Sequence, residues 1–332
     1  MRALVLEKPG KPDTLREADV PQPEPGKGEV RVKVHAVGLN PVDYKLAATG
    51  FPGWKYPFIL GLDIAGVVDA VGQGVSEWEP GDPVYYHGDI TKGGGFSQYA
   101  VVAAHALAWL PDGLDYAAAA ALPCAGFTAY QMVNRKLRVQ PGKTILVHGG
   151  AGGVGGFAVQ LARAAGLTVF ATCSSHNTNF VKDLGAAETI DYKSEKVEDR
   201  VRALTNGRGV DYIVDTVGPE NATASLPMLA FGGEIACAAG LPDFSAIPTG
   251  LEKEWRAISV HDVFLGGAYL SGDRLAQEEL AKIAREFGQL VSKGTIRPML
   301  QEQIHLNDIP EALERLAMRH VRGKIVAVVT PG

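Results

Sequence analysis

The most informative segment for chemistry is the glycine-rich run Gly150-Ala151-Gly152-Gly153-Val154-Gly155. It follows the apolar run 144–148 directly and opens a stretch with helical spacing, which is the context that a G-x-G-x-x-G pattern needs. Glycine is required because the turn is tight, the backbone approaches a pyrophosphate closely, and the helix packs against the strand. Free N–H groups and the helix dipole then face the phosphates. The segment therefore predicts dinucleotide binding; the alternative is an ordinary glycine-rich turn.

The end of the next predicted strand bears on which dinucleotide is bound. About 20 residues after such a turn, an acidic side chain holds the ribose 2′-hydroxyl of NAD. The stretch 172–177 contains Ser174, Ser175 and Asn177 but no Asp or Glu. Since a carboxylate there would repel a 2′-phosphate, we predict NADPH (NADP), with the serine hydroxyls as donors. The stretch has no Arg or Lys of its own, so the alternative is a neutral turn that discriminates little.

Cysteine and histidine are not spaced as a metal or disulfide framework. Cys124, Cys173 and Cys237 lie far apart and form no C-x-x-C pair, which argues against a secreted disulfide scaffold or a self-contained zinc module. No spaced ligand pair is formed by His35, His87, His148 or His261.

Two kinds of domain are expected to position these residues. Before about residue 120, Gly and Pro punctuate short alternating runs, as at 30–34, 65–71 and 82–86, which is typical of a β-rich domain. From about residue 122, strands alternate with glycine turns and helices, which predicts a doubly wound parallel sheet. The strands of this sheet are expected at 144–148, 168–172, 211–214 and 234–238.

The last sixty residues contain pieces that could return the chain to the first domain. Apolar residues at helical spacing run from Ala276 to Leu290, and the run 324–329 reads as a final strand. Between them, Asp308 and Glu311 have the spacing of a capping box, which predicts the start of a last helix.

Length and composition agree with a two-domain globular protein. The chain has 332 residues, 46% hydrophobic and 21% charged, and a domain averages about 150 residues. The formal net charge is −5 without long runs of one sign, which argues against a nucleic-acid surface. No stretch approaches the roughly 18 apolar residues of a membrane span, and no signal-peptide core is evident. We expect a cytoplasmic protein without nucleic-acid or membrane partners.

The chain resembles the medium-chain dehydrogenase/reductase superfamily, specifically its zinc-free quinone-oxidoreductase-like branch, the zeta-crystallin-like proteins. Besides the glycine turn, the segments 37–43 (VGLNPVD), 61–68 (GLDIAGVV) and 121–130 (ALPCAGFTAY) carry the resemblance, which extends over nearly the whole chain. It implies a GroES-like β-rich catalytic domain at 1–121 and 272–332 and a Rossmann dinucleotide-binding domain at 122–271. It further implies a cofactor cleft between them and a homodimer.

Departures from the zinc-dependent members of the family bear on mechanism. Their catalytic zinc takes Cys, His and Cys, and the matching positions here are Asn40, Leu62 and Cys124. One thiol does not hold zinc tightly, and the four-cysteine structural lobe has no counterpart in 87–97, so we predict no zinc. Cys124 is then expected to be a small buried residue beside the cleft.

Reduction of a quinone or an α,β-unsaturated carbonyl needs a Lewis acid less than alcohol oxidation does. The anion formed requires a donor or cation nearby, and the resemblance assigns this catalytic role to Asn40, Tyr44 and Lys45. The alternative is that Tyr44 and Lys45 only line a helix surface. Asp43 is expected to cap the helix or hold Lys45, and Asp63 to support the cleft.

Further cofactor contacts follow only from family position. Asn40 and Thr128 are expected at the nicotinamide, Tyr192 at the adenosine phosphate, and several residues at the carboxyl ends of strands, although each could equally be a packing or surface residue. The remaining expected contacts are Val217, Gly218, Ala239, Gly240, Phe264, Leu265, Gly266 and Lys324.

The sequence therefore predicts an NADPH-dependent quinone or enone reductase. Two alternatives remain: an alcohol dehydrogenase acting on small alcohols or aldehydes, and a non-catalytic NADPH-binding protein. The exact substrate depends on loops such as 46–58 and 241–255, whose aromatic residues suggest a flat, apolar pocket or simply core packing.

Overall fold

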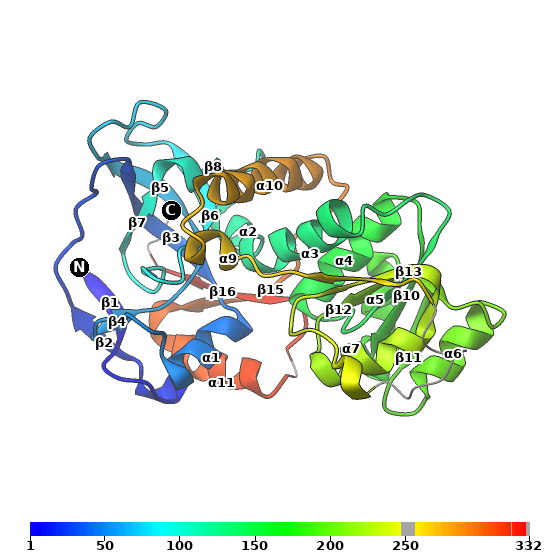
Figure 1. Cartoon of the computed structure of the whole chain (residues 1–332). Helices are drawn as coiled ribbons and strands as arrows, with labels where there is room; N and C mark the ends of the chain where they lie inside the picture. The colour runs from blue at the N-terminus through cyan, green and yellow to red at the C-terminus, as the bar shows by residue number, and fades with distance from the viewer. Residues whose placement is uncertain (247–255, 320, 330–332) are drawn as a thin grey trace. The chain divides into compact units, whose positions relative to one another are not determined.

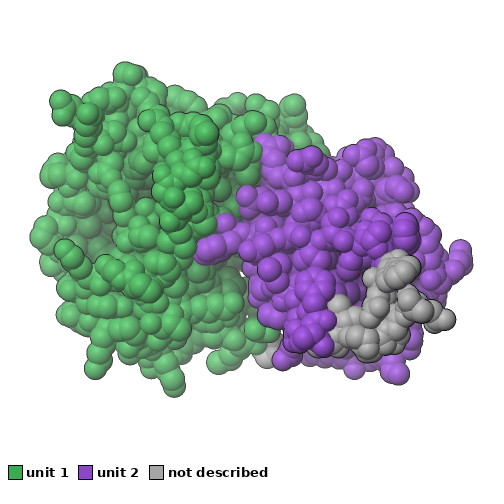
Figure 2. Space-filling view, viewed as in Figure 1, with its two compact units in different colours: residues 1–127, 265–332 green, residues 128–264 purple. Residues whose placement is uncertain are grey.

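The computed structural model describes residues 1–246, 256–319 and 321–329 of the chain. Two compact units are present: unit 1 comprises Met1–Phe127 and Leu265–Gly332, and unit 2 comprises Thr128–Phe264 (Figure 2). The division into a catalytic and a dinucleotide-binding domain that the sequence suggests, at 121/122 and 271/272, stays a prediction. The expected loop 241–255 lies largely outside the described residues.

Unit 1 is built on two sheets (Figure 1). The smaller has the order β2-β1-β4, and the larger the order β15-β16-β3-β5-β6-β8, with β7 also pairing with β3. In both sheets the strand pairs are antiparallel, except that β15 and β16 are parallel. The strands are β1 (Arg2–Leu6), β2 (Arg16–Asp19), β3 (Glu29–Gly38), β4 (Phe58–Ile59), β5 (Asp63–Val71), β6 (Pro83–His87), β7 (Tyr99–Ala103), β8 (Ala108–Trp109), β15 (Leu300–His305) and β16 (Lys324–Val328).

Alternation places one face of the larger sheet in the core. Along β3, Val30, Val32 and Val34 are fully buried while the residues between them are partly exposed, which is the period of two expected for a strand with one buried face. The helices of the unit are α1 (Pro41–Thr49), α2 (Tyr116–Ala120), α9 (Gly267–Leu270), α10 (Arg274–Ser292) and α11 (Ile309–Ala317), with a π-helical turn at Pro123–Phe127.

Helix α10 confirms the predicted helical period near the end of the chain. Asp273 accepts a hydrogen bond from the N–H of Leu275 at 2.9 Å and so caps the helix. Its buried face includes Leu280, Ile283 and Phe287, which are spaced three and four residues apart.

The last helix begins where predicted, since α11 starts at Ile309 with Asp308 as its N-cap, but Asp308 and Glu311 do not form the predicted capping box. The Asp308 carboxylate instead accepts from the N–H of His305 at 3.0 Å, and Leu306–Asp308 form a 3₁₀ turn before α11. The sequence rule expects Ser, Thr, Asp or Asn at the first position and Glu or Gln at the fourth, so it does not indicate the 3₁₀ turn that begins after His305.

Unit 2 contains a six-stranded parallel sheet with the order β11-β10-β9-β12-β13-β14. From β9 the chain adds β10 and β11 on one side and β12, β13 and β14 on the other, so the order reverses between β9 and β12. This is the arrangement of a doubly wound Rossmann sheet, because right-handed crossovers in opposite directions place helices on opposite faces. The strands are β9 (Thr144–Val147), β10 (Thr168–Cys173), β11 (Glu188–Asp191), β12 (Val210–Asp215), β13 (Leu229–Cys237) and β14 (Ser259–Asp262).

The buried centre of this sheet is apolar. Leu146, Ile213 and Ile235 are fully buried on the three central strands, as expected for strands covered on both faces. The helices in the described part of this unit are α3 (Thr128–Tyr130), α4 (Gly153–Ala164), α5 (Thr178–Leu184), α6 (Val197–Leu204) and α7 (Pro219–Ser225), with a second π-helical segment at Gln131–Lys136. Among the described residues of the chain, no helix combines the length and apolar character needed to cross a bilayer.

Candidate functional site

The register of the larger sheet brings polar residues from distant parts of unit 1 together. Gly38 on β3 pairs with Asp63 on β5, and Asp63 pairs with His87 on β6. On the other side of β3, Gly38 pairs with Val326, two residues after Lys324 at the start of β16. Asn40 follows Gly38 by two residues. These side chains therefore meet at one end of the sheet.

The Lys324 ammonium is the centre of this group. It donates to Leu39 O at 2.9 Å, to Asn40 Oδ1 at 2.5 Å and to Asp63 Oδ2 at 3.1 Å, so its three protons are all used. Lys324 is 3% exposed and Asp63 is fully buried. A buried ion pair of this kind is tolerated only when the remaining protons and lone pairs are also satisfied, as they are here.

Asn40 belongs to the same network. Its Nδ2 donates to Asp63 Oδ2 at 2.8 Å and to Gly38 O at 3.4 Å. Both amide protons are therefore engaged inside unit 1, and the side chain is 2% exposed. Asn40 holds Lys324 and Asp63 in register, and what it can offer to another molecule is limited to a lone pair on Oδ1.

Asp43 caps the first helix of unit 1. Its Oδ2 accepts from Asn40 N at 2.8 Å, and Asp43 N donates to Asn40 O at 3.0 Å, so the two residues close the start of α1 reciprocally. Of the two expected roles, the structure therefore shows capping. Burial raises the pKa of Asp43 to about 7; the nearby Asp63 carboxylate adds to this, while the Asn40 N–H and the Lys324 ammonium oppose it.

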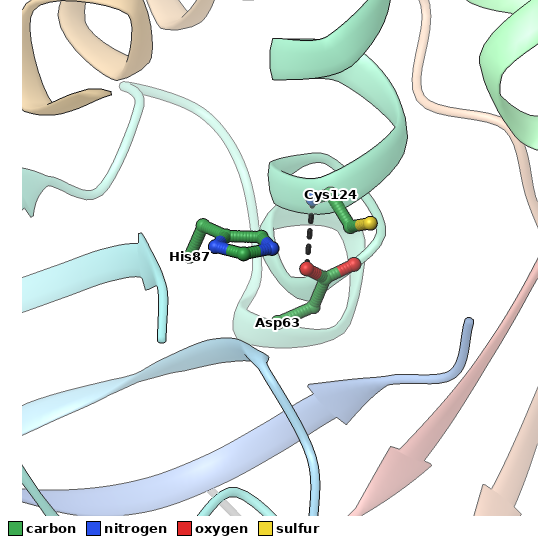
Figure 3. Close-up of side chains that lie close together, drawn as sticks. All are labelled: Asp63, His87 and Cys124. Carbon is green, nitrogen blue, oxygen red and sulfur yellow. Dashed lines mark hydrogen bonds between the residues drawn. The ribbon is translucent and has the colours of Figure 1, made fainter. Parts of the chain in front are cut away.

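Asp63 also belongs to a group of three side chains that could ligate a metal ion. The ligand atoms of Asp63, His87 and Cys124 lie within 4.8 Å of one another, and Figure 3 shows the three side chains converging from β5, the end of β6 and the turn at Pro123–Phe127. Asp63 Oδ1 accepts from Cys124 N at 2.7 Å. Burial lowers the pKa of His87 and raises that of the Cys124 thiol, and His87 Nδ1 is buried without a partner.

Tyr44 and Lys45 differ from this buried network. They lie on α1, where Tyr44 is half-buried and Lys45 is exposed. In the described part of the chain, neither the Tyr44 hydroxyl nor the Lys45 ammonium has a hydrogen-bond or ion-pair partner. Both groups are therefore available as donors to another molecule.

The predicted aromatic pocket of unit 1 includes residues that pack on each other. Trp54 stacks on Phe58 with ring centroids 3.7 Å apart, and its indole N–H donates to Ile90 O at 3.0 Å. Since Phe58 is 8% exposed, this pair contributes mainly to the core.

In unit 2, most of the predicted cofactor residues follow the carboxyl ends of parallel strands. Because all six strands run the same way, these ends share one edge of the sheet, and ligands bind there in open α/β sheets, at the point where strand order reverses. The glycine turn follows β9 at that point. The other predicted residues on this edge are Ser174, Ser175 and Asn177 after β10, Tyr192 after β11, Val217 and Gly218 after β12, Ala239 and Gly240 after β13, and Phe264 after β14.

The glycine turn between β9 and α4 fits a pyrophosphate. A Cβ on Gly155 would lie 2.2 Å from Gly149 O, so this position requires glycine, and one on Gly150 would lie 3.0 Å from Ala171 Cβ, which is a tight contact. A Cβ on Gly152 would meet nothing closer than 3.4 Å, which leaves space on that side of the turn. Since first-turn N–H groups of a helix have no partner within the helix, the start of α4 at Gly153 offers donors to phosphate oxygens.

A buried hydrogen-bond chain supports this turn from beneath. Gly149 N donates to Thr172 Oγ1 at 3.1 Å, and Thr172 Oγ1 lies 3.4 Å from His148 Nδ1. On the other side of the ring, His148 Nε2 lies 2.9 Å from Ser225 Oγ, which itself donates to Asn221 O at 2.7 Å. Since Ser225 has one proton, it accepts from His148, which assigns the proton to Nε2 and leaves Nδ1 to accept from Thr172. Burial lowers the pKa of His148 and keeps this ring neutral.

The loops beside the glycine turn are also fixed. Asp215 at the end of β12 accepts from Val217 N and Gly218 N, each at 3.0 Å, and from the Asn221 side chain. At the end of β10, Ser174 Oγ lies 3.2 Å from the hydroxyl of Tyr192, which is 53% exposed. Residues predicted for the adenosine end of a dinucleotide are thus in contact.

Comparison with known proteins now bears on the whole chain. Residues 26–112 match the family "Alcohol dehydrogenase GroES-like domain", and residues 153–287 match the family "Zinc-binding dehydrogenase". A curated quinone oxidoreductase of Pseudomonas aeruginosa is 33% identical over 320 residues, which is 96% of each chain. The chain belongs to the medium-chain dehydrogenase/reductase superfamily.

Solved structures of this superfamily have the same fold. The quinone oxidoreductase of Pseudomonas syringae pv. Tomato DC3000 superposes with a TM-score of 0.88 at 30% identity, covering 98% of this chain and 99% of that one. A structure titled NAD-dependent alcohol dehydrogenase gives a TM-score of 0.87 at 32% identity, covering 99% and 100%. The quinone-oxidoreductase-like resemblance and the GroES-like and Rossmann architecture are confirmed. The chain is an oxidoreductase of the medium-chain type, and this family binds a nicotinamide cofactor.

The superfamily implies two bound groups, a nicotinamide dinucleotide and a zinc ion, and they fit this chain differently. A dinucleotide fits the glycine turn and the carboxyl edge of unit 2. A divalent zinc ion does not fit the Asp63–His87–Cys124 group as it stands. Both Asp63 oxygens already accept hydrogen bonds, and the Lys324 ammonium lies 3.1 Å from one of them.

The remaining predicted site residues are placed elsewhere in the two units. Thr128 lies in α3 and is 8% exposed, while Leu265 and Gly266 precede α9 and are buried. The Lys324 ammonium contacts the side chain of Asn40. The family resemblance predicts both residues near the cofactor, without predicting that they touch. What the sequence analysis missed is the pairing of Lys324 with Asp63 and the position of His87 beside Cys124.

Proposed function

We propose that this member of the superfamily is an NADPH-dependent reductase that transfers hydride to a quinone or an α,β-unsaturated carbonyl compound without zinc. The observation that carries the proposal is the carboxyl edge of unit 2. A turn that requires glycine lies where the strand order reverses, and hydroxyl groups, not a carboxylate, follow the neighbouring β10. Curated relatives named quinone oxidoreductase support the substrate class.

The preference for NADPH depends on the end of β10. Ser174 and the adjacent Tyr192 present hydroxyls there, and both can donate to a 2′-phosphate. A carboxylate at Ser174 would repel that phosphate and accept from a ribose 2′-hydroxyl instead. We therefore expect wild-type protein to bind NADPH more tightly than NADH in a fluorescence titration, and Ser174→Asp to reverse the order. Equal affinities in the wild type would contradict the preference.

The chain's own contribution to reduction is a donor for the acceptor's oxygen. When bound, the reduced nicotinamide supplies the hydride. As negative charge develops on the carbonyl oxygen, the unpartnered Tyr44 hydroxyl or Lys45 ammonium donates to it. Asn40, whose amide protons are engaged, supports the site by holding Lys324 and Asp63 in place.

An alcohol dehydrogenase is the second candidate, because one solved relative is named an NAD-dependent alcohol dehydrogenase and residues 153–287 match the zinc-binding dehydrogenases. The two functions are separated by a panel of quinones, enones, aldehydes and small alcohols, assayed with each nicotinamide and with metal analysis of the same preparation. Our proposal expects turnover of a quinone or enone that resists chelation. Zinc near one equivalent per chain, with alcohol turnover lost on chelation, would establish the alternative.

We further propose that the protein is a homodimer located in the cytoplasm. Strand β14 is the last strand at one edge of the six-stranded sheet. Phe231 on the neighbouring β13 is 79% exposed, and Phe264, two residues after β14, is 54% exposed. A strand edge that has no partner among the described residues, with apolar neighbours, favours pairing with another copy. Light scattering after size exclusion should give twice the chain mass, and a monomer across the concentration range would refute this.

A further inference from the structure

The Asp63–His87–Cys124 group has the donor types of a transition-metal site. A carboxylate, an imidazole and a thiol are three protein ligands, which is the number that open metal sites use. Two of them are neighbours in the sheet register, and the third is joined to Asp63 through its backbone N–H. Strand pairing thus holds Asp63 and His87 in place, and the hydrogen bond from Cys124 N to Asp63 Oδ1 fixes the third donor (Figure 3).

A positive charge already occupies this environment. The Lys324 ammonium touches Asp63 Oδ2, and it is fixed from two further directions by Leu39 O and Asn40 Oδ1. Because the three acceptors use its three protons, the ammonium cannot turn away without leaving a buried charge unpaired. A divalent ion bound to Asp63 would meet this charge at close range in a buried setting, where screening is weak.

We propose that the Lys324 ammonium is the built-in cation of this group, that it keeps divalent metals out, and that replacing it by an uncharged side chain turns Asp63, His87 and Cys124 into a transition-metal site. This extends the metal independence of the proposed function to a named residue. Lys324 is a positioning residue that acts through Asp63 and Asn40, and the proposal gives it no contact with a substrate.

The test uses full-length protein and Co²⁺ as the probe, since thiolate ligation to cobalt gives a charge-transfer absorption that reports Cys124 directly. Lys324→Met keeps the length of the side chain and removes its charge. We expect this variant to bind one cobalt ion with the thiolate band, at least about 100-fold more tightly than wild type, because a like charge at contact distance has been removed. Lys324→Arg keeps the charge and should exclude cobalt as wild type does.

Two further variants identify the ligands and the specificity of the effect. Adding Cys124→Ser to Lys324→Met should abolish the band, and Lys293→Met, which removes an exposed lysine at the end of α10, should bind no cobalt. Cobalt binding by wild type with a band that Cys124→Ser removes would overturn the proposal. So would a folded Lys324→Met variant that takes up no cobalt.

Loss of the buried cation also destabilises the variant, so thermal unfolding provides a second measurement. Cobalt should raise the unfolding temperature of Lys324→Met and leave that of Lys293→Met unchanged. Equal shifts in both, or none in Lys324→Met, would overturn the proposal. Cobalt uptake does not depend on turnover, so inactivity of the wild type toward quinones would contradict the proposed function and leave this result readable.

Discussion

Lys324 and Asp63 are separated by 261 residues in the chain, yet their side chains form an ion pair at 3.1 Å that is almost completely buried. The pair exists because β16 returns to the sheet beside β3, and β3 also pairs with β5. The last strand of unit 1 thus supplies the cation for a carboxylate near the beginning of the chain. The ends of unit 1 are coupled through a charge as well as through strand pairing.

Asp43 predicts a pH dependence of stability. Its pKa is raised from an ordinary value of 3.8 to about 7 by burial, so the fold favours the neutral carboxyl group. The sign follows from this: the contribution is full below about pH 4 and is lost as the pH rises toward 7, because the unfolded chain releases the proton first. Asp43→Asn removes the titration and keeps an oxygen for Asn40 N–H. Its stability relative to wild type should therefore rise with pH over that interval, by up to about 4 kcal/mol.

The measurement for Asp43 is urea unfolding at several pH values. Asp13→Asn, at an exposed position, serves as the control and should follow the wild-type profile. Parallel profiles for Asp43→Asn and wild type would show that the carboxyl group does not titrate in this interval.

The glycine turn predicts two separable effects. Alanine at 155 places its Cβ 2.2 Å from Gly149 O, so Gly155→Ala should lower the free energy of unfolding by about 1–3 kcal/mol and weaken NADPH binding as well. Alanine at 152 meets no atom closer than 3.4 Å, so Gly152→Ala should fold normally and lose NADPH affinity alone. Thermal unfolding and fluorescence titration of both variants check this. Normal NADPH affinity in Gly152→Ala would mean that phosphates do not approach that side of the turn.

His148 predicts a loss of stability on the acid side. Burial lowers its pKa from an ordinary 6.5, so the folded ring stays neutral while the unfolded chain takes up a proton below that value. Stability is therefore present above about pH 6.5 and falls as the pH decreases. His148→Phe should flatten this dependence and cost about 1–3 kcal/mol at pH 7, because Thr172 loses its acceptor and Ser225 loses a donor. The exposed His176→Phe is the control, and an equal slope in both variants would contradict the assignment.

How much of this was visible in the sequence depends on the distance over which the interactions act. The strand, glycine turn and helix from Thr144 to Ala164 follow from local pattern, and the structure confirms them as β9 and α4. The neighbours of Asp63 do not, because the pairing of β3 with both β5 and β16 is a choice among many registers that no short window contains. Sequence spacing gives no reason to expect His87 as a ligand, although strand pairing places it beside Asp63.

Tyr44 and Lys45 give the last prediction, on catalysis. Both side chains are without partners in the described part of the chain, so their removal breaks no existing hydrogen bond or ion pair. A donor that acts as charge develops contributes to the rate and not to cofactor binding. Tyr44→Phe or Lys45→Met, whichever removes the donor in use, should therefore lower kcat for a quinone or an enone by about 10²–10³ and leave NADPH affinity unchanged. Steady-state kinetics beside fluorescence titration tests this, with the exposed Lys293→Met as the matched control. Near-normal turnover in both variants would mean that α1 presents only a solvated surface here, and that the oxygen of the acceptor is met by another group.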